Sequence, residues 1–189
     1  MSAKSLQQML AIKNWLSQAI NKLSDVDNPN PNLDAELILC FVIKKDRSYL
    51  RAHDDQMLKN DEIEQANLIL RRRLQFVPIA YITGYKEFYG RDFIVNNSTL
   101  IPRPESEDII TLLKDIILKP IPHFPNSNPQ LVDVGTGSGC LGITAKLELP
   151  SFNVTLLDIS ADALNVAQKN AEKMQTDVDI IQSLSLIHI

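Results

Sequence analysis

The feature that most constrains the fold of this chain is a glycine-rich run, Asp133-Val134-Gly135-Thr136-Gly137-Ser138-Gly139. A short aliphatic stretch at Leu131–Val134 precedes the glycines, and an apolar stretch with helical spacing follows them at Cys140–Leu147. Glycines let the backbone turn tightly and let a ligand approach where a Cβ would otherwise stand. A helix N-terminus behind such a loop presents N–H groups that favour an anionic ligand group. The run therefore predicts a strand–loop–helix unit with a ligand site at its loop.

The residues after this unit continue the alternation of strand and helix. Val154–Leu157 and Val178–Ile181 have the composition of short buried strands, and Asp162–Met174 between them is expected to be a helix. Strands that alternate with helices form a parallel sheet, which makes the fold class α/β. Asp158 ends the second strand, so we expect its carboxylate beside the glycine loop, where an acid accepts hydrogen bonds from ribose hydroxyls.

The first 75 residues differ in character, because they contain no glycine and show only helical spacing. Helices are expected over 5–23, Leu33–Ile43 and Asp61–Gln75, with a helical turn near Arg47–Leu50 and no strand. Asn32 is expected to cap the second helix after an Asn/Pro stretch that breaks the first. The pattern predicts a helical N-terminal domain over residues 1–76.

Aromatic and β-branched residues become frequent after Pro78 and are punctuated by glycines. This favours a β-hairpin that turns near Gly90, within a linker over residues 77–100. Pro102 and Pro104 then exclude a regular helix or a central strand. Helical spacing resumes from Ile109 to Ile117, and a proline-rich loop follows over 120–129. Residues 101–189 form the third predicted region.

Two cofactor classes compete for the glycine run. Gly137–Gly142 satisfies the Gly-x-Gly-x-x-Gly spacing of dinucleotide-binding proteins. Asp133, two residues before Gly135, argues against a pyrophosphate, because a carboxylate repels a nearby anion and attracts a cation. A strand–turn–helix that binds nothing is the remaining alternative.

Several segments together resemble the HemK/PrmC family of protein-glutamine N5-methyltransferases. They are residues 78–93, 100–107, 132–140 and 158–171, and weaker likeness extends the resemblance from about residue 32 to about 182. The segment Pro102-Arg103-Pro104 is the most specific, because methyltransferases in general lack it. Ser106 stands where the family usually has threonine, so the hydroxyl is kept.

The resemblance implies a class I methyltransferase with a Rossmann-like parallel sheet that binds S-adenosylmethionine. The helical domain would help to recognise a peptide chain release factor, whose glutamine side-chain amide would be methylated. Asp133 would lie near the ammonium of the cofactor's methionine end, and Arg103 and Ser106 in a segment over the cofactor cleft. The other cofactor-binding residues would be Gly135, Thr136, Gly137, Ser138, Gly139 and Asp158. A surface ion pair of Arg103 with Glu105 or Glu107 is the alternative role for that arginine.

The family's catalytic motif, Asn-Pro-Pro-Tyr, does not occur in residues 1–189, so no catalytic residue is assigned. Residues from about 183 fit no element of the fold and resemble translated sequencing-adapter sequence, and we expect the natural sequence to differ there. The predicted sheet has only three strands and is incomplete for this fold. We therefore expect the polypeptide as written to be unstable or inactive.

Charge and composition bear on the binding partners and the cellular location of the protein. The net charge of −4 and a pI of about 5.4 do not favour nucleic-acid binding, and Arg71–Arg73 are expected to be solvated. No apolar run reaches the ~18 residues that span a membrane.

Cys40 and Cys140 have no metal-ligand spacing, which suggests free thiols in a reducing compartment. Cys140 at a helix N-terminus could have a lowered pKa, although a structural role is favoured. We expect a cytoplasmic monomer without metal. The alternatives are an amino-methyltransferase of nucleic-acid bases, a nicotinamide-dinucleotide binder or an inactive remnant.

Overall fold

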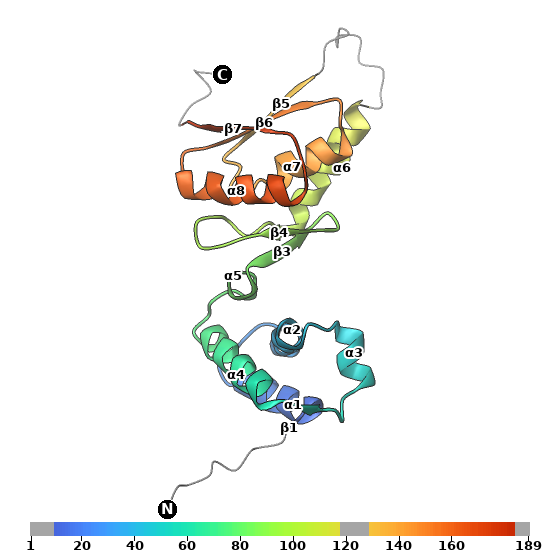
Figure 1. The fold of residues 1–189 in the computed structure, drawn as a ribbon, viewed down its shortest axis with the longest axis vertical. Coiled ribbons are helices and arrows are strands. Elements are labelled where there is room, and N and C mark those ends of the chain that lie inside the picture. Colours follow the sequence, from blue (N-terminus) through green and yellow to red (C-terminus); the bar gives the residue numbers. More distant parts are fainter. Residues whose placement is uncertain (1–9, 118–128, 184–189) are drawn as a thin grey trace, which may run out of the picture. The chain divides into compact units, whose positions relative to one another are not determined.

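The computed structural model describes residues 10–117 and 129–183 (Figure 1). The chain divides into two compact units, Met1–Thr83 and Gly84–Ile189. The expected start of the first helix at residue 5, most of the proline-rich loop and the end of the unassigned tail lie outside the described residues. Among the described residues, no helix is long and apolar enough to cross a membrane.

The first unit consists mainly of helices, as the spacing of apolar residues predicted. They are α1 (Ile12–Ser24), α2 (Pro31–Ile43), α3 (Arg47–Ala52), α4 (Asn60–Leu74) and α5 (Ile79–Thr83). The predicted cap of α2 was wrong by two residues, because Asn30 is the N-cap and Pro31 occupies the first helical position. Proline is favoured there since its fixed φ suits the helix and its missing N–H would have no helical partner.

The prediction of a first unit without strands was also wrong. β1 (Leu10–Ala11) pairs antiparallel with β2 (Met57–Leu58), and Leu10 lies opposite Leu58. Two residues are too few to show an alternating pattern, so the sequence gives no signal for such a bridge. The short helix α5 was likewise not expected, because it lies in a segment rich in aromatic and β-branched residues.

The helices of the first unit close around a core that includes the buried ring of Trp15. The Trp15 Nε1 donates to Asn67 Oδ1 on α4 at 3.0 Å. A polar network joins Asp34 of α2 to the Arg73 Nε at 2.6 Å and to the Asn28 amide at 2.9 Å. The buried Asp34 carboxylate is therefore paired, as a buried charge must be, and the expectation that Arg73 is solvated was wrong.

The second unit begins with the predicted hairpin, formed by β3 (Tyr85–Phe88) and β4 (Arg91–Ile94). Tyr89 and Gly90 turn the chain with φ of 52° and 73°, the pair of positive values that a tight hairpin turn requires. Phe88 and Phe93 meet edge to face in the core that the sheet also lines. The hairpin is therefore packed into the second unit, which begins at Gly84, whereas the sequence suggested a separate linker over 77–100.

The remainder of the second unit is the predicted alternation of strands and helices. Its elements are the 3-10 helix η1 (Pro104–Ser106), α6 (Glu107–Ile117), β5 (Gln130–Val134), α7 (Cys140–Glu148), β6 (Asn153–Asp158), α8 (Ala161–Lys173) and β7 (Asp179–Gln182). The three strands are parallel in the order β5-β6-β7. Because both crossovers proceed in the same direction along the sheet, α7 and α8 lie on the same face (Figure 1).

Candidate functional site

The glycine loop lies where the parallel pairing of β5 and β6 ends. Val134 pairs with Leu157, and the Leu157 carbonyl then accepts hydrogen bonds from the backbone N–H groups of Gly135 at 2.8 Å and Thr136 at 3.0 Å. The loop leads into α7, for which Gly139 is the N-cap. The predicted strand–loop–helix unit is present, and its loop lies at the carboxyl edge of the sheet, where ligands bind in open α/β sheets.

Two glycines of this region have opposite surroundings. Gly135 has φ of 73°, and a Cβ built on it would meet no atom within 4 Å. A Cβ on Gly142, inside α7, would lie 2.2 Å from Leu156 Cδ2 and 3.1 Å from Asp133 Cβ. Gly135 therefore leaves space beside the loop, whereas Gly142 lets α7 pack directly against the sheet.

Asp133 lies in β5 just before the loop and is held by two donors. Its Oδ2 accepts hydrogen bonds from Thr136 Oγ1 at 2.7 Å and from the Gly142 N–H at 3.0 Å. Burial raises the pKa of Asp133, the two hydrogen bonds oppose that rise, and the negative charge of Asp158 adds to it. A cation beside this carboxylate would relieve the cost of burying its charge.

Asp158, the last residue of β6, is buried and joins two loops. Its Oδ2 accepts from the Gly137 N–H and its Oδ1 from the Ser160 N–H, both at 2.9 Å. Each carboxylate oxygen can accept a further hydrogen bond. The structure thus brings Asp158 to the glycine loop, as its position at the end of the second strand predicted.

The remaining loop side chains are a threonine and a serine, and both are buried. Thr136 donates to Asp133, as described above, whereas the Ser138 hydroxyl is buried and has no hydrogen-bond partner among the described residues. A buried hydroxyl without a partner costs free energy, but the enclosed Ser138 oxygen is not exposed to a ligand at the loop.

Residues 100–107, which contain Pro102 and Pro104 and are called the proline-flanked segment below, come close to the glycine loop where the segment begins. The backbone nitrogen of Leu100 lies 4.0 Å from the position that a Cβ on Gly137 would occupy. Arg103 is exposed and forms no ion pair with Glu105, Glu107 or any other described residue, so the surface ion pair considered for it is absent. Ser106 donates its backbone N–H to the Arg103 carbonyl at 3.0 Å, and among the described residues no hydrogen bond or ion pair joins either side chain to the loop.

The Cys140 thiol, at the start of α7, is not activated. Burial raises its pKa to about 11, which outweighs any benefit from the helix N-terminus. A structural role, which the sequence favoured, is consistent with this shift. Within residues 10–117 and 129–183, no group of three or more His, Cys, Asp or Glu side chains could hold a metal ion.

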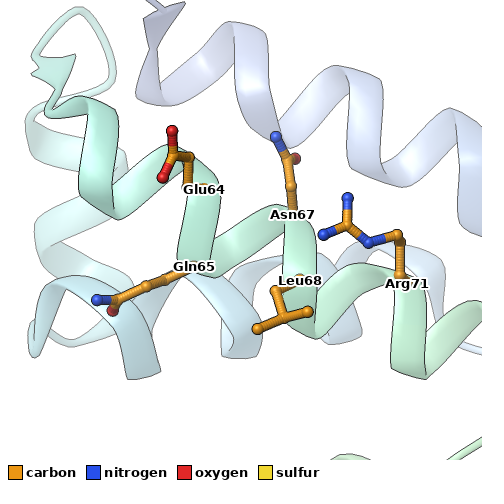
Figure 2. Close-up of a pocket in the computed structure, with 5 residues that line it drawn as sticks. All are labelled: Glu64, Gln65, Asn67, Leu68 and Arg71. Carbon is orange, nitrogen blue, oxygen red and sulfur yellow. The ribbon is translucent and has the colours of Figure 1, made fainter.

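Two further hollows lie on the described part of the chain. One lies on α4 and is lined by Glu64, Gln65, Asn67, Leu68 and Arg71 (Figure 2). Asn67 there points toward α1, where it accepts the hydrogen bond from Trp15, and the other polar side chains do not converge on a common point. The second hollow, between α6, β5 and α7, is apolar except for Asp133. The glycine loop is therefore the strongest candidate.

Sequence reasoning assigned no role to Asn170, although the structure places it at this site. Its side-chain Nδ2 donates to the carbonyl of Ser138 at 2.8 Å. The available signal was an amide among the alanines of the buried face of α8, between Ala167 and Ala171. That pattern shows an unusual polar residue in a core, and only the fold shows which groups it contacts.

Curated relatives of the chain are methyltransferases. It is 38% identical to the release factor glutamine methyltransferase of Koribacter versatilis, over 90% of this chain and 59% of that protein. It is 33% identical to the enzyme of the same description from Buchnera aphidicola, over 95% of this chain and 60% of that protein. It is 37% identical to a bifunctional methyltransferase of Rickettsia bellii, over 94% of this chain and 35% of that protein. The chain thus spans less than two thirds of the length of these relatives.

A solved coclaurine N-methyltransferase aligns with 91% of this chain and 49% of that one, at 14% identity and a TM-score of 0.38. This likeness is too distant to support a conclusion.

A parallel sheet with a glycine loop after its first strand and a carboxylate at the end of the next is the Rossmann-like arrangement that class I methyltransferases have. Two family models match the chain, the PrmC N-terminal domain over residues 14–84 and the methyltransferase small domain over residues 115–186. These matches confirm the resemblance to the HemK/PrmC family that was noted from the sequence.

Proposed function

We propose that the glycine loop of this chain binds S-adenosylmethionine, the sulfonium nucleoside that supplies the methyl group in this class of enzymes. The geometry of the loop fits the chemistry of that ligand. Asp133 offers a partly buried carboxylate to the cationic ammonium, and Asp158 offers acceptor positions to the ribose hydroxyls. The open space at Gly135 provides room for the ligand beside the loop.

We further propose that the complete protein transfers this methyl group to the side-chain amide of a glutamine in a peptide chain release factor. The descriptions of the relatives and the match of residues 14–84 to the PrmC N-terminal domain support this substrate. The observation that carries the proposal is the placement of two carboxylates, Asp133 and Asp158, on adjacent strands beside one glycine loop. Asp133 would repel a dinucleotide pyrophosphate at the loop, whereas an acid in the position of Asp158 binds ribose in both classes of cofactor.

An amide nitrogen is a poor nucleophile, so the enzyme must supply most of the rate by positioning the amide and polarising it. In the family, Asn-Pro-Pro-Tyr performs this task, and residues 1–189 do not contain that motif. We therefore propose that the 189-residue chain binds S-adenosylmethionine but does not transfer its methyl group.

Calorimetric titration of the chain with S-adenosylmethionine, S-adenosylhomocysteine and NADH tests the cofactor assignment. We expect binding of the first two and none of NADH. Asp158→Asn should weaken binding of both sulfur nucleosides, because the carboxylate acceptor for the ribose is lost. Binding of NADH without binding of either sulfur nucleoside would overturn the proposal.

Incubation with radiolabelled S-adenosylmethionine and a release factor tests the activity. We expect no labelled release factor from residues 1–189, and labelling from a version of the protein that continues beyond β7 with a further strand and carries Asn-Pro-Pro-Tyr just after it. Labelling by residues 1–189 would contradict the proposed inactivity. Labelling of nucleic acid in place of the release factor, with steep dependence on salt, would favour a base amino-methyltransferase.

A further inference from the structure

Asn170 is a fully buried amide on α8, with 0% exposure, and its hydrogen bonds are directed at two other parts of the second unit. Its Oδ1 accepts from the backbone N–H of Ile94 at 2.7 Å, and its Nδ2 donates to the Ile94 carbonyl at 3.0 Å. The second hydrogen of Nδ2 goes to the Ser138 carbonyl at 2.8 Å. Asn170 thus pairs with Ile94 as a neighbouring strand would.

These hydrogen bonds require an explanation beyond packing. A buried amide gains little over an apolar side chain of similar shape and is costly if its partners are lost. The neighbours of Asn170 on the same helix face, Ala167 and Ala171, are buried and apolar. An amide at this position is therefore better explained by what it holds in place than by the core it occupies.

One of the groups that Asn170 holds is the glycine loop. The hydrogen bond to the Ser138 carbonyl fixes the peptide plane between Ser138 and Gly139. The two neighbouring N–H groups of the loop are also engaged, Gly137 with Asp158 Oδ2 and Gly139 with the Thr136 carbonyl, both at 2.9 Å. Asn170 thus completes the set of bonds that defines the shape of the loop.

The other group is the end of the hairpin, which leads into the proline-flanked segment. Ile94 is the last residue of β4, and the chain continues from it through the buried Thr99 to Leu100. The Leu100 backbone nitrogen lies beside Gly137, as described above. One side chain therefore anchors both the loop and the base of the segment that passes next to it.

We propose that Asn170 is a positioning residue that holds the glycine loop and the segment after β4 in the relative arrangement that S-adenosylmethionine requires. This inference rests on the proposed cofactor. It assigns to Asn170 no contact with the ligand, because the side chain has no remaining donor and is enclosed by the groups that it bonds.

The test compares Asn170→Leu and Asn170→Asp with Val166→Ala in the full 189-residue chain. Leucine removes all three hydrogen bonds at similar volume, and aspartate keeps the shape and the acceptor for the Ile94 N–H but loses both donors. Val166 is buried one turn earlier on α8, so its truncation lowers stability without touching the loop. Melting temperatures establish that the variants and the control are comparably destabilised.

Two measurements are made on each variant, the affinity for S-adenosylhomocysteine by calorimetry and the exchange of the Gly137 and Gly139 amide hydrogens by NMR. Each lost hydrogen bond of this kind is worth about a tenfold change in an equilibrium. We expect both Asn170 variants to bind at least about tenfold more weakly and to exchange the two amides faster in the absence of ligand. Val166→Ala should match wild type in both measurements.

The proposal is overturned if both Asn170 variants match Val166→Ala in affinity and in exchange, or if neither variant folds, since Asn170 then acts only on stability. If wild type itself does not bind the nucleoside, the proposed function fails. The exchange of the ligand-free loop still reports whether Asn170 positions it, so the two failures can be told apart.

Discussion

Gly135 and Gly90 provide a matched pair of substitutions for testing the ligand site. Both residues have φ of 73°, and a Cβ on either would meet no atom within 4 Å. They differ in place, because Gly135 begins the glycine loop and Gly90 is at the turn of the hairpin. Gly135→Ala and Gly90→Ala should therefore differ in ligand binding and not in strain.

The expected magnitudes follow from that geometry. An L residue in the left-handed region costs roughly 1–2 kcal/mol, and the open surroundings add no steric clash to it. Each variant should therefore lose about 1–2 kcal/mol of stability, which lowers the melting temperature of a domain of this size by about 5–15 °C. If the ligand fills the space beside Gly135, the methyl group of Gly135→Ala is forced against it. This costs roughly 1–3 kcal/mol of binding free energy, which corresponds to a loss of affinity of about 5- to 150-fold.

Differential scanning calorimetry and titration with S-adenosylhomocysteine measure the two effects separately. We expect equal melting temperatures for the two variants, wild-type affinity for Gly90→Ala and weakened affinity for Gly135→Ala. If Gly135→Ala binds within twofold of Gly90→Ala, the open space beside Gly135 is not where the ligand lies, and the reasoning is refuted.

Three further predictions concern the same unit. Gly142→Ala should lower the melting temperature, because the overpacking cost of roughly 1–3 kcal/mol against Leu156 exceeds the helix gain of at most about 1 kcal/mol; a Leu156→Val background should reduce the loss, and an unchanged melting temperature in the wild-type background would contradict the close seating of α7. Burial raises the pKa of Asp133 above 3.8, so the affinity for the cationic nucleoside should fall at a higher pH than with an ordinary aspartate when the pH is lowered, because the carboxylate is protonated earlier. The stability of the ligand-free chain should instead fall as the pH rises through that raised pKa. Asp133→Asn should bind weakly at every pH, and a pH dependence of the affinity retained in that variant would count against the assignment. With a pKa of about 11, Cys140 should react slowly with iodoacetamide at pH 8 in the native chain and quickly in denaturant, as peptide mass spectrometry would show; fast native labelling would disprove its inert role.

Much of the fold could be predicted because its signals are local. The helices of the first unit, the hairpin turning at Tyr89 and Gly90 and the alternation after β5 each follow from periodicity or turn chemistry within a few residues. The errors arose where too few residues carry the signal. The bridge between β1 and β2 involves two residues on each side, and the cap of α2 depended on which of several asparagines precedes the first helical turn.

The candidate site divides in the same way. The glycine loop before a helix at Gly135–Gly139 and the position of Asp158 at the end of the next strand could be read from local residue patterns, because they depend on spacing within short segments. The contact of Gly142 with Leu156, the hydrogen bond from Thr136 to Asp133 and the bonds by which Asn170 joins Ile94 to Ser138 became known from the folded arrangement. Those contacts connect residues whose proximity is created by packing of the sheet, the hairpin and α8, and no pattern along the chain encodes it.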